Sequence, residues 1–301
     1  MIKGFGNSAQ GCPSLSLALW ADAWLSDGAS PDAVIDGLSG WADLHLVTAE
    51  SAEVADAAGL DWPGAQEPGA VALLGLFRRL AGPGQIRLLL PSAGDTRGLT
   101  PGTAHTRDAI SAGETLLLSP AQPLGAFRGL GLIPVREGRD VIRWAVYGLS
   151  AEDSATLPGP HALGEARHQL REAVRDAAEM FTRIQTVGAS PAAARARITE
   201  LTEQAHDHSL PPTVSARVAD VLDSAAMVAA ILTVAAESAG GNAATTSAAA
   251  LAEETLRRLW GVVREARLAA VHEAARDLAG GTPTAAPLPS SVQARRGGQG
   301  S

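Results

Sequence analysis

The pattern of apolar and polar positions changes near residues 157–160, where the sequence is Leu-Pro-Gly-Pro. Before this point, short apolar runs alternate with turns that contain Gly or Pro, as in strands and short helices. After it, apolar residues recur every three or four positions, which is typical of amphipathic helices. We therefore expect a mixed α/β domain at 1–150, a Pro/Gly linker at 151–162, an all-helical domain at 163–280 and a disordered tail at 281–301.

The expected N-terminal domain is a mixed sheet with covering helices. Its apolar runs predict five strands, at 44–48, 86–90, 115–118, 130–135 and 141–147. The last two flank a turn that contains Gly138, so they predict a β-hairpin. Helical patterns between the strands predict helices at 14–25, 30–38, 70–80 and 103–112, the last one closed by Gly113. Strands interleaved with helices favour a single sheet of mixed α/β or α+β class.

The C-terminal half predicts a domain like a four-helix bundle. The expected helices cover 163–184, 191–204, 209–237 and a stretch that ends at 278, and Gly240-Gly241-Asn242 is expected to break the chain before the last of them. The apolar run at 225–236 would be about 18 Å long as a helix, against a bilayer core of about 30 Å. It therefore indicates a buried core helix, and no membrane partner is expected.

Composition restricts the function further. The formal net charge of -8, with Lys3 as the sole lysine, opposes binding to a phosphate backbone, so we expect no nucleic acid partner. Cys12 is the only cysteine, which excludes an internal disulfide and a thiolate zinc site and favours a reducing cytoplasmic compartment. The first residues lack the apolar region of a secretory signal.

The best candidate for a ligand-binding site is the loop at residues 91–102, because it follows the predicted strand at 86–90. Its polar anchors are Asp95 and Arg97, and its flexible glycines are Gly94 and Gly98. Two candidate proton carriers, His105 and Glu114, lie nearby in the sequence. The alternative is a simple turn with a local ion pair.

No catalytic motif is present, and the pair of histidines in His206-Asp207-His208 does not make a metal ligand set, so we expect neither cofactor nor metal. The leading hypothesis is a non-enzymatic adaptor or regulator that uses its helical surfaces to bind a protein partner or a second copy of itself. The alternative is a small-molecule-binding protein or enzyme with its site at the 91–102 loop. A DNA-binding regulator is a third hypothesis, which the charge balance opposes.

Several segments resemble an uncharacterised family of conserved hypothetical proteins from high-GC actinobacteria. They are Arg87-Leu88-Leu89-Leu90-Pro91, Gly94-Asp95, Arg97-Gly98-Leu99, Ala112-Gly113-Glu114 and Gly131-Leu132-Ile133-Pro134. The resemblance extends into the helical half, which implies that both halves belong to one type of protein, and it implies no particular mechanism.

Overall fold

The computed structural model describes residues 11–65, 67–82, 85–138, 140–150, 159, 162–185, 190–242 and 246–280. The expected tail at 281–301 and most of the expected linker at 151–162 lie outside these residues. In chain order, the elements are α1 (Pro13–Leu25), α2 (Pro31–Ser39), β1 (Leu44–Ala49), α3 (Ala52–Ala58), α4 (Gly69–Leu80), β2 (Ile86–Leu89), α5 (Ala104–Ala112), β3 (Thr115–Leu118), β4 (Gly129–Arg136), β5 (Val141–Leu149), α6 (Leu163–Gln185), α7 (Pro191–His206), α8 (Ala216–Asn242) and α9 (Thr246–Gly280).

The predicted mixed sheet with covering helices is confirmed. Its strand order is β1-β5-β4-β3-β2, with β1 parallel to β5 and the other neighbours antiparallel. The predicted hairpin is formed by β4 and β5, where Gly129 is paired with Leu149. Because β1 and β2 each pair with one strand only, they form the two edges of the sheet.

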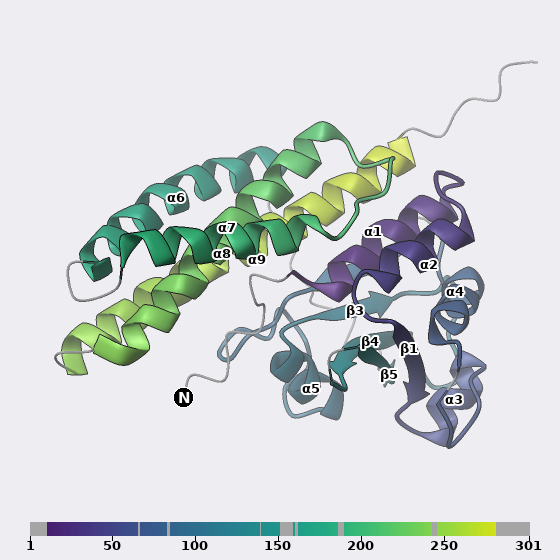
Figure 1. Ribbon diagram of the computed structural model, residues 1–301. Coiled ribbons are helices and arrows are strands. Elements are labelled where there is room, and N and C mark those ends of the chain that lie inside the picture. The colour runs from purple at the N-terminus through teal and green to yellow at the C-terminus, as the bar shows by residue number, and fades with distance from the viewer. Residues whose placement is uncertain are drawn as a thin grey trace, which may run out of the picture.

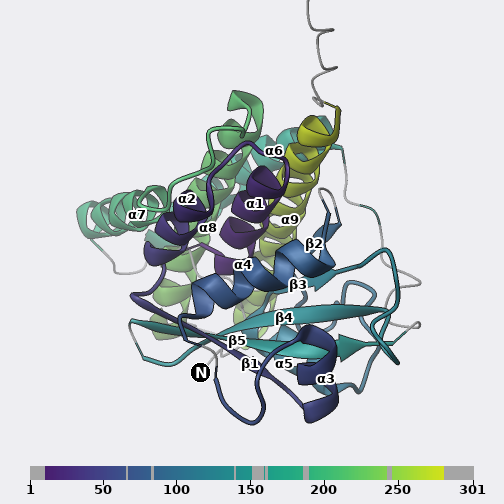
Figure 2. The same ribbon diagram turned by 90° about the vertical axis from the view of Figure 1, so that its right-hand side faces the viewer.

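The sheet has a helical layer on each face, and the helical half lies beyond one of these layers (Figures 1 and 2). Helices α1 and α4 pack on one face, and α1 also contacts α9. On the opposite face, α5 and the side chain of Leu99 cover residues such as Leu117 and Tyr147. A single buried apolar cluster includes residues of the sheet, of α1 and of the four helices α6–α9, so the two halves share a core.

Helix α1 is buried almost all round because it lies between the sheet and α9 (Figure 1). Pro13 at its first turn fits a helix start, since proline has no N–H to leave unpaired there. The Cys12 side chain precedes the helix and accepts a hydrogen bond from the Leu15 N–H. Trp20 connects α1 to the helical half, because its Nε1 donates a hydrogen bond to the Ser209 carbonyl, 3.0 Å away, in the loop between α7 and α8.

One helix was missed, and two predictions about elements need correction. Helix α3 was not predicted, although Ser51 caps its start and Gly59, with φ of 61°, ends it. Helix α8 begins at Ala216 rather than at residue 209. Its predicted break at Gly240-Gly241-Asn242 is also wrong, because α8 continues through Asn242. Each helical glycine costs only about 1 kcal/mol, which the packing of α8 against α9 offsets.

Part of α8, Ala216–Glu237, is long and apolar enough to cross a membrane by length and composition. Its most apolar stretch has a mean hydropathy of 1.8, and half of that stretch is buried inside the protein. Val228, Ala229 and Leu232 are fully buried against neighbouring helices. The packing therefore accounts for this apolar character as that of a core helix.

Candidate functional site

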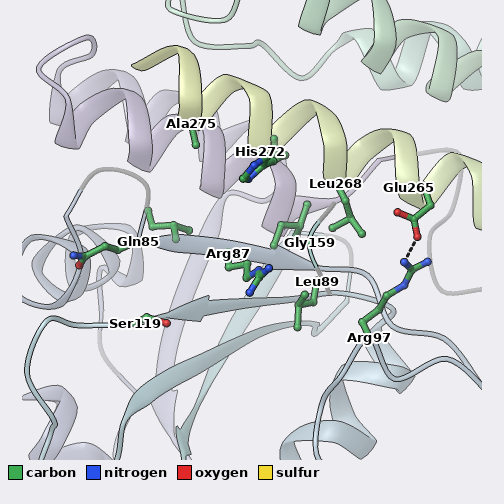
Figure 3. Close-up of a pocket in the computed structure, with 13 residues that line it drawn as sticks. Gln85, Arg87, Leu89, Arg97, Ser119, Gly159, Glu265, Leu268, His272 and Ala275 are labelled. Atoms are coloured by element: carbon green, nitrogen blue, oxygen red, sulfur yellow. Dashed lines mark hydrogen bonds and ion pairs between the residues drawn. The ribbon is translucent and has the colours of Figure 1, made fainter. Parts of the chain in front are cut away.

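A groove of about 450 Å³ lies between the edge strand β2 and helix α9 (Figure 3). One wall is the stretch 85–89, which is β2 and the residue before it. The other wall is one face of α9, with residues spaced by about one helical turn: Glu265, Leu268, Val271, His272 and Ala275. Arg97 closes one end, and Ser119 and Gly159 also line the groove. This volume suits a small organic ligand.

Arg97 reaches the groove because the 91–102 loop makes two tight turns. Ser92 and Asp95 exchange backbone hydrogen bonds of 2.8 and 2.9 Å around Gly94, which has φ of 84°. Arg97 itself has φ of 56°, a left-handed backbone that is uncommon outside glycine. Such strain persists only where the surroundings hold it in place, and here two carboxylates do so.

The two carboxylates that hold Arg97 come from different halves of the chain. The Arg97 Nε lies 2.9 Å from Asp95 Oδ2, and the Asp95 Oδ1 accepts the Arg97 backbone N–H at 3.2 Å. Arg97 Nη1 donates to Glu265 on α9, as the dashed line in Figure 3 marks. The Arg97 side chain is only 12 % exposed. The ion pair with Asp95 fits the simple-turn alternative, but the contact with Glu265 places Arg97 between the loop and the helical half.

Two more basic groups face the groove. Arg87 lies on β2 and His272 lies opposite on α9, with its ring directed toward the strand (Figure 3). Burial lowers the pKa of Arg87. Burial also lowers the pKa of His272, and the positive charges of Arg276 and Arg87 lower it further. At neutral pH the His272 ring is therefore uncharged and can either donate or accept a hydrogen bond.

The other two candidate residues, Glu114 and His105, lie away from the groove. Glu114 is buried beneath α1, where its Oε2 accepts hydrogen bonds from the Cys12 Sγ at 3.0 Å and from the Ser14 backbone N–H at 2.7 Å. Arg267 of α9, only 4 % exposed, acts electrostatically on both side chains. Cys12, Glu114 and Arg267 form what we call the buried cluster.

Burial dominates the electrostatics of the buried cluster. It raises the pKa of Glu114 and of Cys12, and the Arg267 charge opposes part of both shifts. It also lowers the pKa of Arg267. Because the cluster joins α1, the start of β3 and α9, it ties the two halves of the chain together rather than facing a ligand.

His105 of α5 lies on the opposite face of the sheet. Its Nε2 is 3.0 Å from the Thr115 hydroxyl, and its ring is tilted against the Tyr147 ring at 5.4 Å. Tyr147 donates to Asp108 Oδ2 at 2.6 Å. Burial and the Asp108 carboxylate both raise the pKa of Tyr147. His105 therefore belongs to a hydrogen-bonded layer beneath α5.

The two histidines near residue 207 point to different partners. His206 Nε2 lies 3.3 Å from Asp223 Oδ1, while the His208 ring stacks on Trp41 with centroids 3.4 Å apart. Among the described residues, no group of three or more His, Cys, Asp or Glu side chains is arranged to hold a metal ion.

The sequence analysis located Arg97 but missed Arg87, Glu265 and His272. A signal for Arg87 exists, because it interrupts the apolar run of the strand at 86–90. Glu265 and His272 give no such signal, since charged residues seven positions apart are ordinary on a helix surface.

Fold and groove together define a two-part protein, an α/β half joined to a helical bundle, with a groove of ligand size at the junction. The chain belongs to the Rv1486c-like family. The model of the family's N-terminal domain matches residues 14–157, and that of its C-terminal domain matches residues 164–268. The expected membership of an actinobacterial family is thereby confirmed.

Three mycobacterial relatives are similar over most of their length. The uncharacterized protein Rv1486c of Mycobacterium tuberculosis is 36% identical over 281 residues, which cover 86% of this chain and 96% of the relative. ML1804 of Mycobacterium leprae is 33% identical, with 87% and 96% covered. MAV321 of Mycobacterium avium is 35% identical, with 73% and 78% covered. No solved structure matches the chain.

Proposed function

We propose that this protein binds a small organic anion in the groove between β2 and α9 and acts without catalysis. The observation that carries this proposal is the position of Arg97 at one end of the groove, nearly buried and held on two sides by Asp95 and Glu265. A guanidinium has five N–H donors. Asp95 faces Nε and Glu265 faces Nη1, so the proposed ligand would bind at Nη2, which neither carboxylate faces.

The chemistry of the two walls suggests what the ligand looks like. A guanidinium group such as that of Arg97 binds carboxylate or phosphate through hydrogen bonds. The uncharged His272 ring adds a donor or an acceptor. Leu268 and Val271 give the α9 wall an apolar surface between these polar groups. A ligand with an anionic end and a short apolar body fits this lining.

An adaptor that uses its helical surfaces, the leading hypothesis from the sequence, has less support. Among the described residues, Met227 is the only large apolar side chain that is strongly exposed on α6–α9, at 48 %. A protein-binding surface of standard size needs a contiguous patch instead. We keep the cytoplasm as the expected location, because the single cysteine is unpaired and buried.

The proposal can be tested by thermal unfolding with a panel of simple anions, namely acetate, butyrate, succinate, citrate and inorganic phosphate. Ligand binding to the folded state stabilises it by about 2.7 kcal/mol at one hundred times Kd. We expect at least one carboxylate to raise the melting temperature of the wild type in a saturable way. The Arg97→Gln variant should lose that shift, which NMR of amide signals from β2 and α9 would locate.

The matched control is Arg257→Gln, because Arg257 is an exposed arginine of α9 that pairs with Glu253 one turn away. This variant should bind like the wild type. If no anion shifts the groove signals, or if Arg97→Gln and Arg257→Gln behave alike, the groove is not an anion site and the proposal is wrong.

A further inference from the structure

The β2 strand presents an open backbone edge to the groove. The Ser119 N–H donates to the Gln85 carbonyl at 3.3 Å, so these two residues form a hydrogen-bonded pair of the antiparallel ladder with β3. Hydrogen-bonded and non-bonded pairs alternate along such a ladder. Residues 85, 87 and 89 therefore pair with β3, and the backbone groups of Ile86 and Leu88 point the other way.

The outward backbone groups of Ile86 and Leu88 face the groove. Ile86 and Leu88 belong to the shared core, and both residues line the groove. No backbone group of any described residue pairs with them. An edge strand with free N–H and C=O groups is a template on which another strand can form.

The groove runs along the whole of β2, which sets the length of a segment that could be added. A strand rises about 3.3 Å per residue, so the five residues 85–89 span about 13 Å, enough for a segment of about four residues. The α9 wall offers apolar contacts to alternate side chains of such a segment. Arg97 closes one end of the groove, so a carboxylate at the corresponding end of the segment would meet its guanidinium.

We propose that the natural ligand of the groove is an extended peptide from a partner protein, which adds as a strand to the free edge of β2 and places a carboxylate on Arg97. This inference rests on the proposed anion site and names its ligand class. Backbone hydrogen bonds to Ile86 and Leu88 provide affinity. The Arg97 guanidinium and the apolar α9 wall select the sequence.

The first step of the test is a selection with the full-length protein. A phage library that displays random heptapeptides with free C-termini is panned on the wild type and on Ala275→Trp, a variant whose new side chain fills the groove. Ala216→Trp, which adds the same side chain at an exposed position of α8, is the control. We expect peptides with an acidic group to be enriched on the wild type and on the control, but not on Ala275→Trp.

The second step asks whether the enriched peptide binds as a strand. A fluorescein-labelled synthetic copy is measured by anisotropy, beside copies with single backbone N-methyl groups. Methyl groups on alternate residues should weaken binding about tenfold each, because each one removes a hydrogen bond and leaves a carbonyl of β2 unpaired. Methyl groups on the intervening residues should be tolerated. A copy with a C-terminal amide tells whether the carboxylate comes from the chain end or from a side chain.

Three results would overturn the inference: equal enrichment on wild type and Ala275→Trp, no enrichment at all, or binding that is insensitive to backbone methylation. If simple carboxylates still bind through Arg97 while peptides do not, the peptide inference fails and the anion site stands. If neither binds, both fail.

Discussion

Replacing Arg267 by methionine tests whether the buried cluster holds the two halves of the chain together. Arg267 is 4 % exposed and Glu114 is 6 % exposed, so neither charge can turn to water without local unfolding. Methionine keeps most of the apolar stem but removes the charge that opposes the effect of burial on Glu114. Arg267 acts on Glu114 through its charge, and leaving a buried carboxylate without a compensating charge costs about 3–5 kcal/mol.

This cost converts into a measurable shift of the melting temperature. A chain of this length loses about 2 °C per kcal/mol, so Arg267→Met should melt about 6–10 °C below the wild type. In the double variant Glu114→Gln/Arg267→Met neither charge of the buried cluster is left, and the glutamine oxygen can still accept the Ser14 N–H. The double variant should therefore melt above Arg267→Met.

The pH dependence gives a second readout of the same reasoning. Burial raises the pKa of Glu114 in the folded state. The contribution of protonated Glu114 to the free energy of unfolding is fully present below about pH 4.3, and it is lost as the pH rises through the pKa of Glu114 in the folded state. The deficit of Arg267→Met should therefore be smaller at pH 5 than at pH 8, whereas the double variant should show no such trend.

The assay is differential scanning calorimetry of the four proteins of this cycle at both pH values, with Arg257→Met as an exposed control that should stay within about 0.5 kcal/mol of the wild type. A melting temperature of Arg267→Met within about 1 °C of the wild type would refute the reasoning. So would a double variant that melts lower than either single variant.

Three further outcomes follow from buried contacts. His45 accepts a hydrogen bond from the Trp144 Nε1 at 3.1 Å, and burial lowers its pKa. The contribution of the uncharged His45 ring to stability should therefore be present above about pH 6.5 and be lost as the pH falls through the folded pKa. Urea unfolding midpoints at pH 7 and pH 5 would detect this loss. A Cβ at Gly131 would lie 2.3 Å from His105 Nε2, so Gly131→Ala should lower the urea unfolding free energy by about 1–3 kcal/mol. Cys12 is 2 % exposed and burial raises its pKa, so iodoacetamide should modify it only in denaturant, as mass spectrometry would show.

Much of the fold is predictable because the signals for strands and helix ends are local. The five strands each coincide with a short apolar run, and Gly113 closes α5 with φ of 78° as a left-handed cap. Helix α3 has equally local signals in Ser51 and Gly59, and only its shortness hides it. The glycines at 240 and 241 mislead because tertiary packing outweighs their low helix propensity.

The site is less predictable because its parts are distant in sequence. Arg97 and Glu265 are 168 positions apart, and only the docking of α9 along β2 joins them. Glu114 and His105 lie near the 91–102 loop in sequence, but the direction of each side chain depends on the face of the sheet to which its segment belongs. Glu114 turns toward α1 and His105 turns toward Tyr147, so neither reaches the groove.

One helix, α9, contributes to both the groove and the buried cluster, and this links ligand binding to the contact between the two halves. Glu265 and Arg267 are two positions apart, so they project from different sides of the helix. Glu265 contacts Arg97 at the groove, whereas Arg267 acts electrostatically on Glu114 beneath α1. Sliding α9 along β2 would change the groove and would also move the Arg267 charge away from Glu114, whose buried carboxylate would then lose the charge that opposes the effect of burial. The groove is therefore held at one width by the core behind it, and a rigid groove favours ligands that already have the extended shape.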